Sequence, residues 1–144
     1  MSFLNILMAD DNADDRFLTK EAFYEAKINY KMDFVENGEE LIDFLNRNNK
    51  YSHLKNEVLP NLILLDLNMP KKDGREALKE IKSNENLKKI PVVILTTSKA
   101  EEDITKTYSL GANSFISKPI SFDEFVDVVK VFAKYWSEVS ELPY

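Results

Sequence analysis

The sequence of 144 residues contains no cysteine, one histidine and only three glycines. The absence of cysteine excludes disulfide scaffolds, thiolate zinc sites and cysteine nucleophiles, and a single histidine excludes a metal centre built from several imidazoles. No apolar run approaches the roughly 20 residues of a membrane-spanning helix. The run Phe3–Ala9 is short, lacks the basic flank of a signal peptide and leads directly into Asp10 and Asp11. We therefore expect a protein of the cytoplasm with no membrane partner.

The charge balance is acidic, because 19 lysines and arginines stand against 25 aspartates and glutamates, for a net charge of −6. Binding to nucleic acid requires clustered basic residues, so we expect no nucleic-acid partner. Hydrophobic residues make up 44% of the chain, which excludes a disordered protein. The length suits one domain, and we expect residues 1–144 to form it.

Short apolar runs alternate five times with longer amphipathic stretches. The expected strands are Phe3–Ala9, Tyr30–Val35, Leu62–Leu65, Val92–Leu95 and Ser114–Ser117, and the expected helices lie near 13–27, 37–47, 74–83, 99–110 and 121–140. This order predicts an α/β fold with a parallel sheet and helices on both faces. The second strand alternates and the fifth is short and mixed, so we place both at sheet edges. The other three are almost continuously apolar, which is typical of strands buried on both faces.

Four of the expected helices begin with capping-box spacing or a close variant of it, which supports the assignment of the elements. The pairs are Asn37 with Glu40, Asp73 with Glu76, Ser98 with Glu101 and Ser121 with Glu124. One irregular stretch, 48–60, is longer than a usual connection and contains His53, which we expect to be a solvated side chain.

Reactive side chains follow four of the five strands: Asp10 and Asp11 follow the first, Asp66 the third, Thr96 the fourth and Lys118 the fifth. Ligands of open parallel sheets bind at the carboxyl ends of the strands, so we expect these side chains to converge. Three carboxylates repel each other by about 4 kcal/mol per pair at 4 Å and an effective dielectric near 20. One of them must be protonated or a cation must lie among them, and oxygen ligands favour Mg²⁺, Ca²⁺ or Mn²⁺.

The same constellation suits phosphoryl transfer, which needs positioning and charge neutralisation. Asp66 comes from a central strand and is the expected phosphoryl acceptor, since carboxylates do accept phosphoryl groups. Asp10 and Asp11 open a loop and are better placed to hold a metal ion. Lys118 and Thr96 supply a positive charge and a hydroxyl.

Each of these residues has a simpler explanation when it is taken alone. The segment 10–12, together with Asp14 and Asp15, offers several caps for the first helix. Thr96 is an ordinary strand-end hydroxyl, and Lys118 an ordinary solvated charge. Their joint placement after four different strands favours the functional interpretation.

The chain resembles receiver domains of two-component response regulators, of the chemotaxis-regulator type. The resemblance covers essentially the whole chain and rests on Asp10-Asp11, on Asp66-Leu67-Asn68-Met69-Pro70 with Asp73-Gly74, on Thr96 after Pro91-Val92-Val93-Ile94-Leu95, and on Lys118-Pro119 after Gly111-Ala112. It implies a flavodoxin-like doubly wound (βα)5 fold with the strand order 2-1-3-4-5. It also implies a single receiver domain without an output domain.

The resemblance implies a role for each matching residue. Asp66 would take a phosphoryl group from the phosphohistidine of a sensor histidine kinase. Mg²⁺ would be held by Asp11, Asp66 and the backbone carbonyl of Asn68, with Asp10 assisting. Lys118 would pair with the phosphoryl group, Thr96 would move to hydrogen-bond it, and Phe115 matches the aromatic switch position. Asn68 and Ser98 would influence the attacking water, and the Lys118–Pro119 bond would be cis.

A protein of this kind is a phosphoryl acceptor that catalyses its own phosphotransfer and slow dephosphorylation, and not an enzyme with turnover. Within the family, the 48–60 insertion, the paired Thr96-Thr97 and the extended last helix are most similar to phytochrome-associated single-domain response regulators. The resemblance therefore implies a phytochrome as the partner kinase. The surface formed by helix 99–110, strand Ser114–Ser117 and helix 121–140 would change on phosphorylation.

The last helix carries more apolar residues than one core face needs. One stripe consists of Phe122, Phe125, Val126, Val129, Phe132, Ala133 and Trp136, and it is widened by Val128, Val131, Tyr135 and Val139. Either the tail with Leu142 and Tyr144 folds over the extra face, or a second copy of the chain covers it. We favour a homodimer through this helix and its two neighbours.

Other functions fit the residues less well. A phosphatase of the haloacid dehalogenase type would need a second aspartate where Asn68 stands. The acidic segment 9–15 would repel the phosphate of FMN, and the P-loop signature is missing. A phosphorylation-independent interaction module remains the alternative, since an acidic pocket does not prove that phosphorylation takes place.

Overall fold

The computed structural model describes residues 3–143 and shows a five-stranded parallel sheet in the order β2-β1-β3-β4-β5. The strands are β1 (Leu4–Ala9), β2 (Tyr30–Val35), β3 (Leu62–Leu65), β4 (Val92–Thr96) and β5 (Ser114–Ser117). The helices are α1 (Ala13–Glu25), α2 (Gly38–Asn46), α3 (Gly74–Ser83), α4 (Glu101–Leu110) and α5 (Phe122–Lys134). The predicted α/β fold, its strand order and both edge strands are confirmed.

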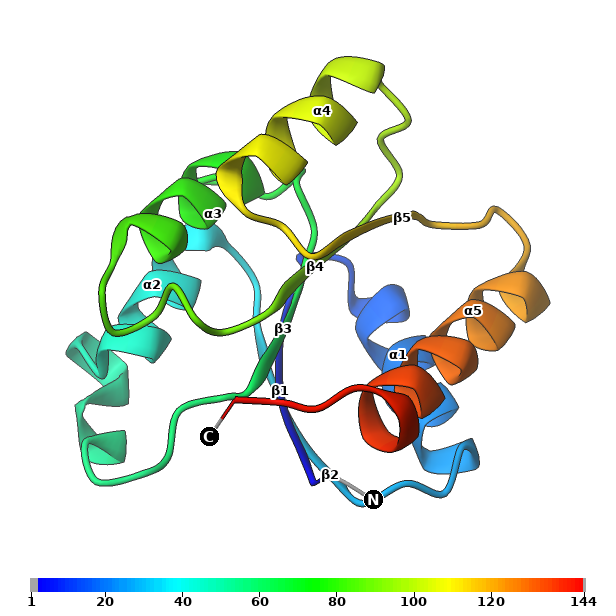
Figure 1. Ribbon diagram of the computed structural model, residues 1–144, viewed down its shortest axis with the longest axis horizontal. Helices are drawn as coiled ribbons and strands as arrows, with labels where there is room; N and C mark the ends of the chain where they lie inside the picture. The colour runs from blue at the N-terminus through cyan, green and yellow to red at the C-terminus, as the bar shows by residue number, and fades with distance from the viewer. Residues whose placement is uncertain (1–2, 144) are drawn as a thin grey trace.

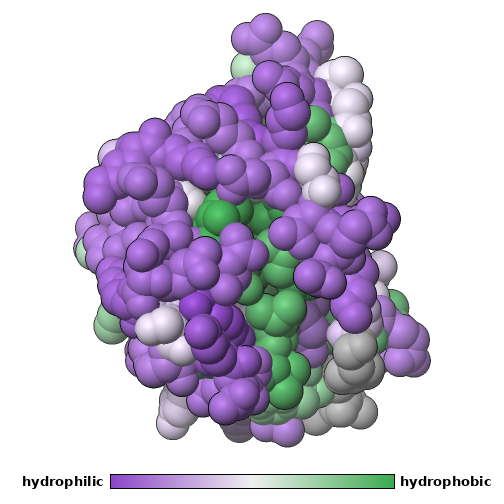
Figure 2. All heavy atoms as spheres, turned by 90° about the vertical axis from the view of Figure 1, so that its left-hand side faces the viewer, coloured by the Kyte–Doolittle hydropathy of each residue, from purple (hydrophilic) through white to green (hydrophobic). Residues whose placement is uncertain are grey.

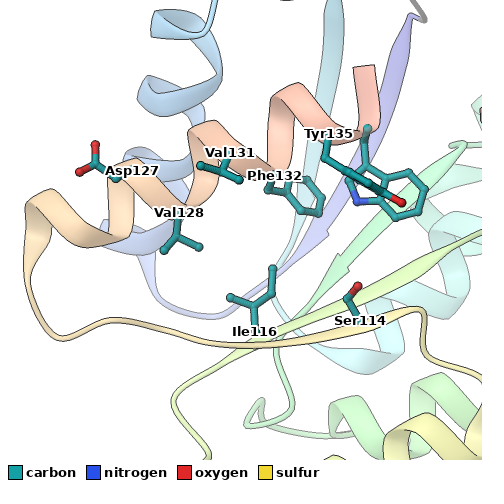
Figure 3. A pocket seen from close by; sticks show the side chains of 8 residues that line it. Ser114, Ile116, Asp127, Val128, Val131, Phe132 and Tyr135 are labelled. Atoms are coloured by element: carbon teal, nitrogen blue, oxygen red, sulfur yellow. The ribbon is translucent and has the colours of Figure 1, made fainter. Parts of the chain in front are cut away.

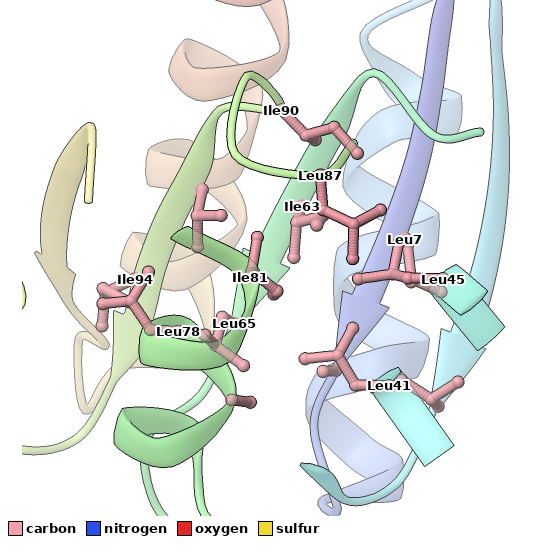
Figure 4. Packing of buried hydrophobic residues seen from close by; sticks show 14 of the residues in the cluster. Leu7, Leu41, Leu45, Ile63, Leu65, Leu78, Ile81, Leu87, Ile90 and Ile94 are labelled. Carbon is pink, nitrogen blue, oxygen red and sulfur yellow. The ribbon is translucent and has the colours of Figure 1, made fainter. Parts of the chain in front are cut away.

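Helices cover both faces of the sheet, with α1 and α5 on one side and α2, α3 and α4 on the other (Figure 1). Successive side chains of a strand point to opposite faces, so each buried strand contributes side chains to the hydrophobic cores on both faces of the sheet. Leu7, Ile63, Leu65 and Ile94 pack with α2 and α3, as Figure 4 shows. The alternate residues Ile6, Leu62, Leu64 and Val93 pack with α1 and α5. This explains why β1, β3 and β4 read as continuous apolar runs.

Three of the four predicted helix caps are present. The side chains of Asn37, Asp73 and Ser121 accept hydrogen bonds from the first backbone N–H groups of α2, α3 and α5. The prediction for Ser98 is wrong, because α4 begins at Glu101 after Ala100, which makes no side-chain cap. The Ser98 hydroxyl instead donates to the Asp103 carboxylate at 2.7 Å, which draws Ser98 away from the cap position.

The last helical stretch has about the extent predicted near 121–140, because α5 ends at Lys134 and continues directly into a π-helical turn, η2 (Tyr135–Val139). Phe122 belongs to the expected apolar stripe, but it is the first residue of α5 and is 63% exposed. Leu142 is buried with the α1–α5 core, so the tail does fold back. Tyr144 lies outside the described residues.

The irregular stretch 48–60 contains a 3-10 helix, η1 (Asn49–Leu54), that packs against the end of α2. The rings of Phe44 and Tyr51 lie 5.0 Å apart, and the guanidinium of Arg47 donates to the carbonyl oxygens of Phe44 and Val58. The insertion is therefore fixed to the body of the domain. His53 is exposed, as expected for a solvated side chain.

The face that carries α2, α3 and α4 is mostly hydrophilic, with a strip of hydrophobic side chains running down between the polar surfaces (Figure 2). Among the helices of residues 3–143, none has both the length and the apolar character needed to cross a bilayer.

A bidentate ion pair ties the start of α3 to α4. The guanidinium of Arg75 donates through Nε and one terminal nitrogen to the two carboxylate oxygens of Asp103, each at 2.7 Å. These hydrogen bonds, with the one from Ser98, lower the pKa of Asp103 from 3.8 to about 2. The pair fixes the β4–α4 connection beside the end of β3, where the reactive residues lie.

We expect the Asp103 carboxylate to stabilise the folded protein at neutral pH and to lose this contribution in strong acid. Its contribution is complete above pH 3.8, the ordinary pKa, and is lost as the pH falls through about 2. Because both side chains keep some exposure to water, we expect about 1–2 kcal/mol, less than the full shift implies. In urea unfolding, the free energy of unfolding of wild type should exceed that of Asp103→Asn by this amount at neutral pH. The two values should be equal in strong acid. Glu102→Gln, which changes a neighbouring exposed carboxylate, is the control. A gap that does not change with pH would contradict this explanation.

Candidate functional site

The ends of three strands are held in register by backbone hydrogen bonds that continue beyond the strands. The amide of Asp10 donates to Val35 at 3.0 Å, that of Asp66 to Ala9 at 2.9 Å, and that of Lys118 to the carbonyl of Thr96 at 2.7 Å. These bonds extend the parallel ladder by one residue. They place the side chains of Asp10, Asp66 and Lys118 together at one edge of the sheet.

Three carboxylates gather at this edge, as the sequence predicts. Oxygen atoms of Asp10, Asp11 and Asp66 lie within 4.8 Å of one another. Asp10 and Asp66 are buried, at 1% and 6% exposed, while Asp11 is open to solvent. Two buried carboxyl groups beside one that is open to solvent form a site that an ion can reach from water.

Lys118 lies among these acids, and its ammonium donates three hydrogen bonds to carboxylates. The acceptors are Oδ2 of Asp10 at 2.7 Å, Oδ2 of Asp15 at 2.8 Å and Oδ2 of Asp66 at 3.1 Å. Burial alone would lower the pKa of Lys118, but the hydrogen bonds and charges of these carboxylates outweigh it and raise the pKa. Lys118 is therefore a charged, buried member of the site and not a solvated surface lysine.

Asp15 is a further member of the site, which the sequence pattern indicates only as a possible helix cap. The cap of α1 is Asn12, whose side chain accepts from the amide of Asp15 at 3.0 Å, which leaves the carboxylate of Asp15 free to reach Lys118. Its position in the first turn of the helix that follows β1 was the available signal. A side chain there remains beside the carboxyl edge of the sheet.

Asp10 carries two functions at once. Its Oδ1 accepts a hydrogen bond from the amide of Asn12 at 2.9 Å, and its Oδ2 accepts from Lys118. Burial is the largest influence on its carboxyl and raises the pKa, while the hydrogen bond and charge of Lys118 oppose that effect. The capping interpretation is thus confirmed for Asn12, and the functional role of Asp10 stays a prediction that its contact with Lys118 supports.

The remaining predicted residues surround this pocket. Thr96 is fully buried at the end of β4, and Asn68, two residues beyond Asp66, is exposed. Phe115 is half-buried on the α3–α4 side, and its amide donates to the hydroxyl of Tyr108 at 3.1 Å. The Lys118–Pro119 bond is trans, so the expectation of a cis bond is wrong. The trans form is the one that X-Pro amides prefer by about 0.5–1 kcal/mol.

A close backbone contact fixes the loop that carries Asp66. A Cβ on Gly74 would lie 2.2 Å from the carbonyl oxygen of Asp66, and the amide of Gly74 donates to Leu67 at 2.9 Å. Only glycine permits α3 to begin this close to the end of β3. The position of the Asp66 side chain is therefore set by the packing of α3.

The donor set fits a hard divalent cation. The ammonium of Lys118 donates to the carboxylates of Asp10, Asp15 and Asp66. The carboxylate of Asp11 lies beside those of Asp10 and Asp66, so the acidic groups of the site outnumber this ammonium. Each close pair of carboxylates costs about 3–4 kcal/mol at an effective dielectric near 20. The oxygens of Asp10, Asp11 and Asp66 are suitable ligands for Mg²⁺ or Mn²⁺, and such an ion would leave a pocket able to take a phosphoryl group.

Comparison with known proteins agrees with this chemistry. The family model of the response regulator receiver domain matches residues 6–130. Response regulator Rcp1 of Synechocystis sp. is 39% identical over 138 residues, which are 96% of this chain and 92% of Rcp1.

Two solved structures share the fold over nearly their whole length. The crystal structure of the Mn(2+)-bound form of Rcp1 has a TM-score of 0.92 at 38% identity and covers 98% of this chain and 99% of its own. The crystal structure of the phosphorylated cyanobacterial phytochrome response regulator RcpA has a TM-score of 0.92 at 38% identity, over 99% and 100% of the two chains. The chain therefore belongs to the receiver-domain family of response regulators, the signalling proteins of two-component phosphorelays.

Proposed function

We propose that Asp66 accepts a phosphoryl group from the phosphohistidine of a sensor histidine kinase. In this step the phosphorus–nitrogen bond breaks, the histidine nitrogen keeps the electron pair, and a carboxylate oxygen of Asp66 forms the new bond to phosphorus. The observation that carries the proposal is the contact between Lys118 Nζ and Asp66 Oδ2 at 3.1 Å, inside the group of three carboxylates. An ammonium at that distance can neutralise charge on the transferred group.

Mg²⁺ is the ion we propose for this pocket, with Asp11, Asp66 and the backbone carbonyl of Asn68 as ligands and Asp10 assisting. When bound, it would neutralise the carboxylates and the phosphoryl oxygens. The proposal is supported by the arrangement of the carboxylate oxygens, and by the description of Rcp1 as a protein that binds Mn²⁺. In our proposal Lys118 pairs with the phosphoryl group and the hydroxyl of Thr96 donates a hydrogen bond to it. Phe115 moves inward with Thr96.

The kinase is expected to dock around this edge of the sheet. Three large apolar side chains are exposed close to the site in sequence: Phe17 two residues after Asp15, Ile120 two residues after Lys118, and Phe122 at the start of α5. Exposed apolar residues beside a charged pocket are typical of a protein-binding surface.

We further propose a phytochrome as the kinase. RcpA, which is described as a phytochrome response regulator, has the same fold over nearly the whole chain.

The first test is transfer to Asp66. With Mg²⁺ and acetyl phosphate or a phosphorylated kinase, we expect one phosphoryl group on the wild-type chain, located at Asp66 by borohydride trapping and mass spectrometry. Asp66→Asn should reduce labelling to background, because the accepting oxygen is removed. Its melting temperature should stay equal or rise, since one of the mutually repelling carboxylates is gone.

Asp14→Asn is the matched control, because Asp14 lies in the same helical turn as Asp15 and is exposed. It should label like wild type. Undiminished labelling of Asp66→Asn would refute the assignment. A wild-type chain that takes no phosphoryl group from any donor would favour a phosphorylation-independent interaction module.

A second test concerns the metal ion without any phosphoryl chemistry. An ion that binds only the folded chain stabilises it by about 2.7 kcal/mol at a hundredfold excess over its dissociation constant. We expect saturating Mg²⁺ to raise the melting temperature of the wild type, and Asp11→Asn to remove most of the increase. Because the side chain of Asp11 is exposed, its replacement should change the stability of the metal-free protein little. An equal increase in wild type and Asp11→Asn would contradict this ligand set.

We also propose that the chain forms a homodimer through α4, β5 and α5. A groove of about 500 Å³ runs between β5 and α5. Figure 3 shows Ile116 of β5 facing Val128 and Phe132 of α5 across it. Val131 of α5 and Tyr135 at the start of η2 remain 69% and 49% exposed, although the tail has folded back. This apolar surface at the sheet edge supports a second copy of the chain as its partner.

The dimer is tested by placing a charge in the groove. Val131→Lys should raise the dimer dissociation constant about tenfold or more, because a buried ammonium would lack a partner. Light scattering with Mg²⁺ and beryllofluoride is the measurement. Val58→Lys is the control, since Val58 is also highly exposed but lies in the segment that follows η1. A wild-type chain that remains monomeric at high concentration, with and without beryllofluoride, would exclude the dimer.

A further inference from the structure

Lys118 has no hydrogen-bond donor to spare. An ammonium carries three protons, and the side chain donates one hydrogen bond each to Asp10, Asp15 and Asp66, at 2.7, 2.8 and 3.1 Å. The side chain of Lys118 is only 5% exposed, so water cannot readily exchange with these acceptors. A phosphoryl oxygen that pairs with Lys118 must therefore displace one of the three carboxylates.

Asp15 differs from the other two acceptors. The carboxylates of Asp10 and Asp66 belong to the group that fits a cation, and Asp15 is not a member of that group. Its backbone is fixed, because its amide donates to Asn12 and its carbonyl accepts from the Thr19 hydroxyl at 2.7 Å. A cation bound by the other carboxylates would weaken their hold on Lys118 and leave that of Asp15 intact. Asp15 is thus the acceptor that remains in competition with an incoming phosphoryl group.

We propose that Asp15 is a positioning residue which holds Lys118 in the unphosphorylated protein and competes with the phosphoryl group for the same proton. The inference rests on the function proposed above. In the phosphorylated state one donor of Lys118 passes from the Asp15 carboxylate to a phosphoryl oxygen. The carboxylate turns toward solvent, to which it is already 21% exposed. Asp15 thereby lowers the stability of the phosphorylated form, both by competing for Lys118 and by repelling a second anion.

Beryllofluoride, which takes the place of the phosphoryl group on an aspartate, allows this competition to be measured at equilibrium. With saturating Mg²⁺ we expect Asp15→Asn to bind beryllofluoride about three- to tenfold more tightly than wild type by calorimetry, because a nearby negative charge is removed. Asp15→Glu, which keeps the charge, should bind like wild type. The gain should shrink at high salt, since the side chain is partly exposed.

Asp14→Asn is again the matched control, because it removes the same charge from the adjacent exposed position. Equal affinities of Asp15→Asn and Asp14→Asn would show that general charge is responsible and would overturn the inference. Weaker binding by Asp15→Asn would also overturn it, because Asp15 would then orient Lys118 toward the phosphoryl group. A purely structural role would lower the melting temperature of Asp15→Asn and leave the affinity unchanged.

The failure of the inference differs from the failure of the proposed function. A wild-type chain that binds no beryllofluoride in the presence of Mg²⁺ would contradict both the proposed function and the inference about Asp15. A wild-type chain that binds it, with an affinity that Asp15→Asn does not increase, would remove the inference alone. Acetyl phosphate labelling provides a second readout, in which Asp15→Asn should have a lower half-saturating concentration and a longer-lived phosphoryl group than Asp14→Asn.

Discussion

The site depends on one buried ammonium surrounded by acids. Lys118 offsets part of the repulsion among carboxylates that come from the ends of β1 and β3 and from α1. Without it the same aspartates would lie together at a cost of several kcal/mol. With it the pocket still holds an excess of negative charge, which is the physical reason for its affinity for a divalent cation. A metal ion would offset this excess, whereas a phosphoryl group would add negative charge that the metal ion and Lys118 must balance together.

The fold supplies this arrangement through the geometry of a parallel sheet. Strands buried on both faces must end where their apolar runs end, and the next residue then emerges at the carboxyl edge. The backbone hydrogen bonds of Asp10, Asp66 and Lys118 extend the ladder by one residue and fix the three side chains. The pair of Arg75 and Asp103 ties α4 to the start of α3 beside the same loop. A change of charge at Asp66 therefore arises next to the helices that lead to the α4–β5–α5 surface.

Much of this could be predicted from the sequence, because the strands are apolar and the acids follow them directly. The positions of Asp10, Asp66 and Lys118 required only the strand pattern and the rule for carboxyl ends. Other details depend on tertiary partners that no local pattern reveals. Ser98 does not cap α4, because its hydroxyl donates a hydrogen bond to Asp103, which Arg75 holds in place. The contact of Asp15 with Lys118 joins residues 103 positions apart, and a local cap was the simpler interpretation of the same aspartate.

In the proposed mechanism a divalent cation and a phosphoryl group share one pocket, and Lys118 contacts both the carboxylates and the phosphoryl group. A crystal structure of the chain with Mg²⁺ and beryllofluoride tests it most directly. We expect Mg²⁺ on the oxygens of Asp11 and Asp66, beryllofluoride joined to Asp66, and Lys118 Nζ within hydrogen-bonding distance of a fluorine. Beryllofluoride on another residue, or a Lys118 that stays with its carboxylates and does not touch the bound group, would contradict the shared pocket.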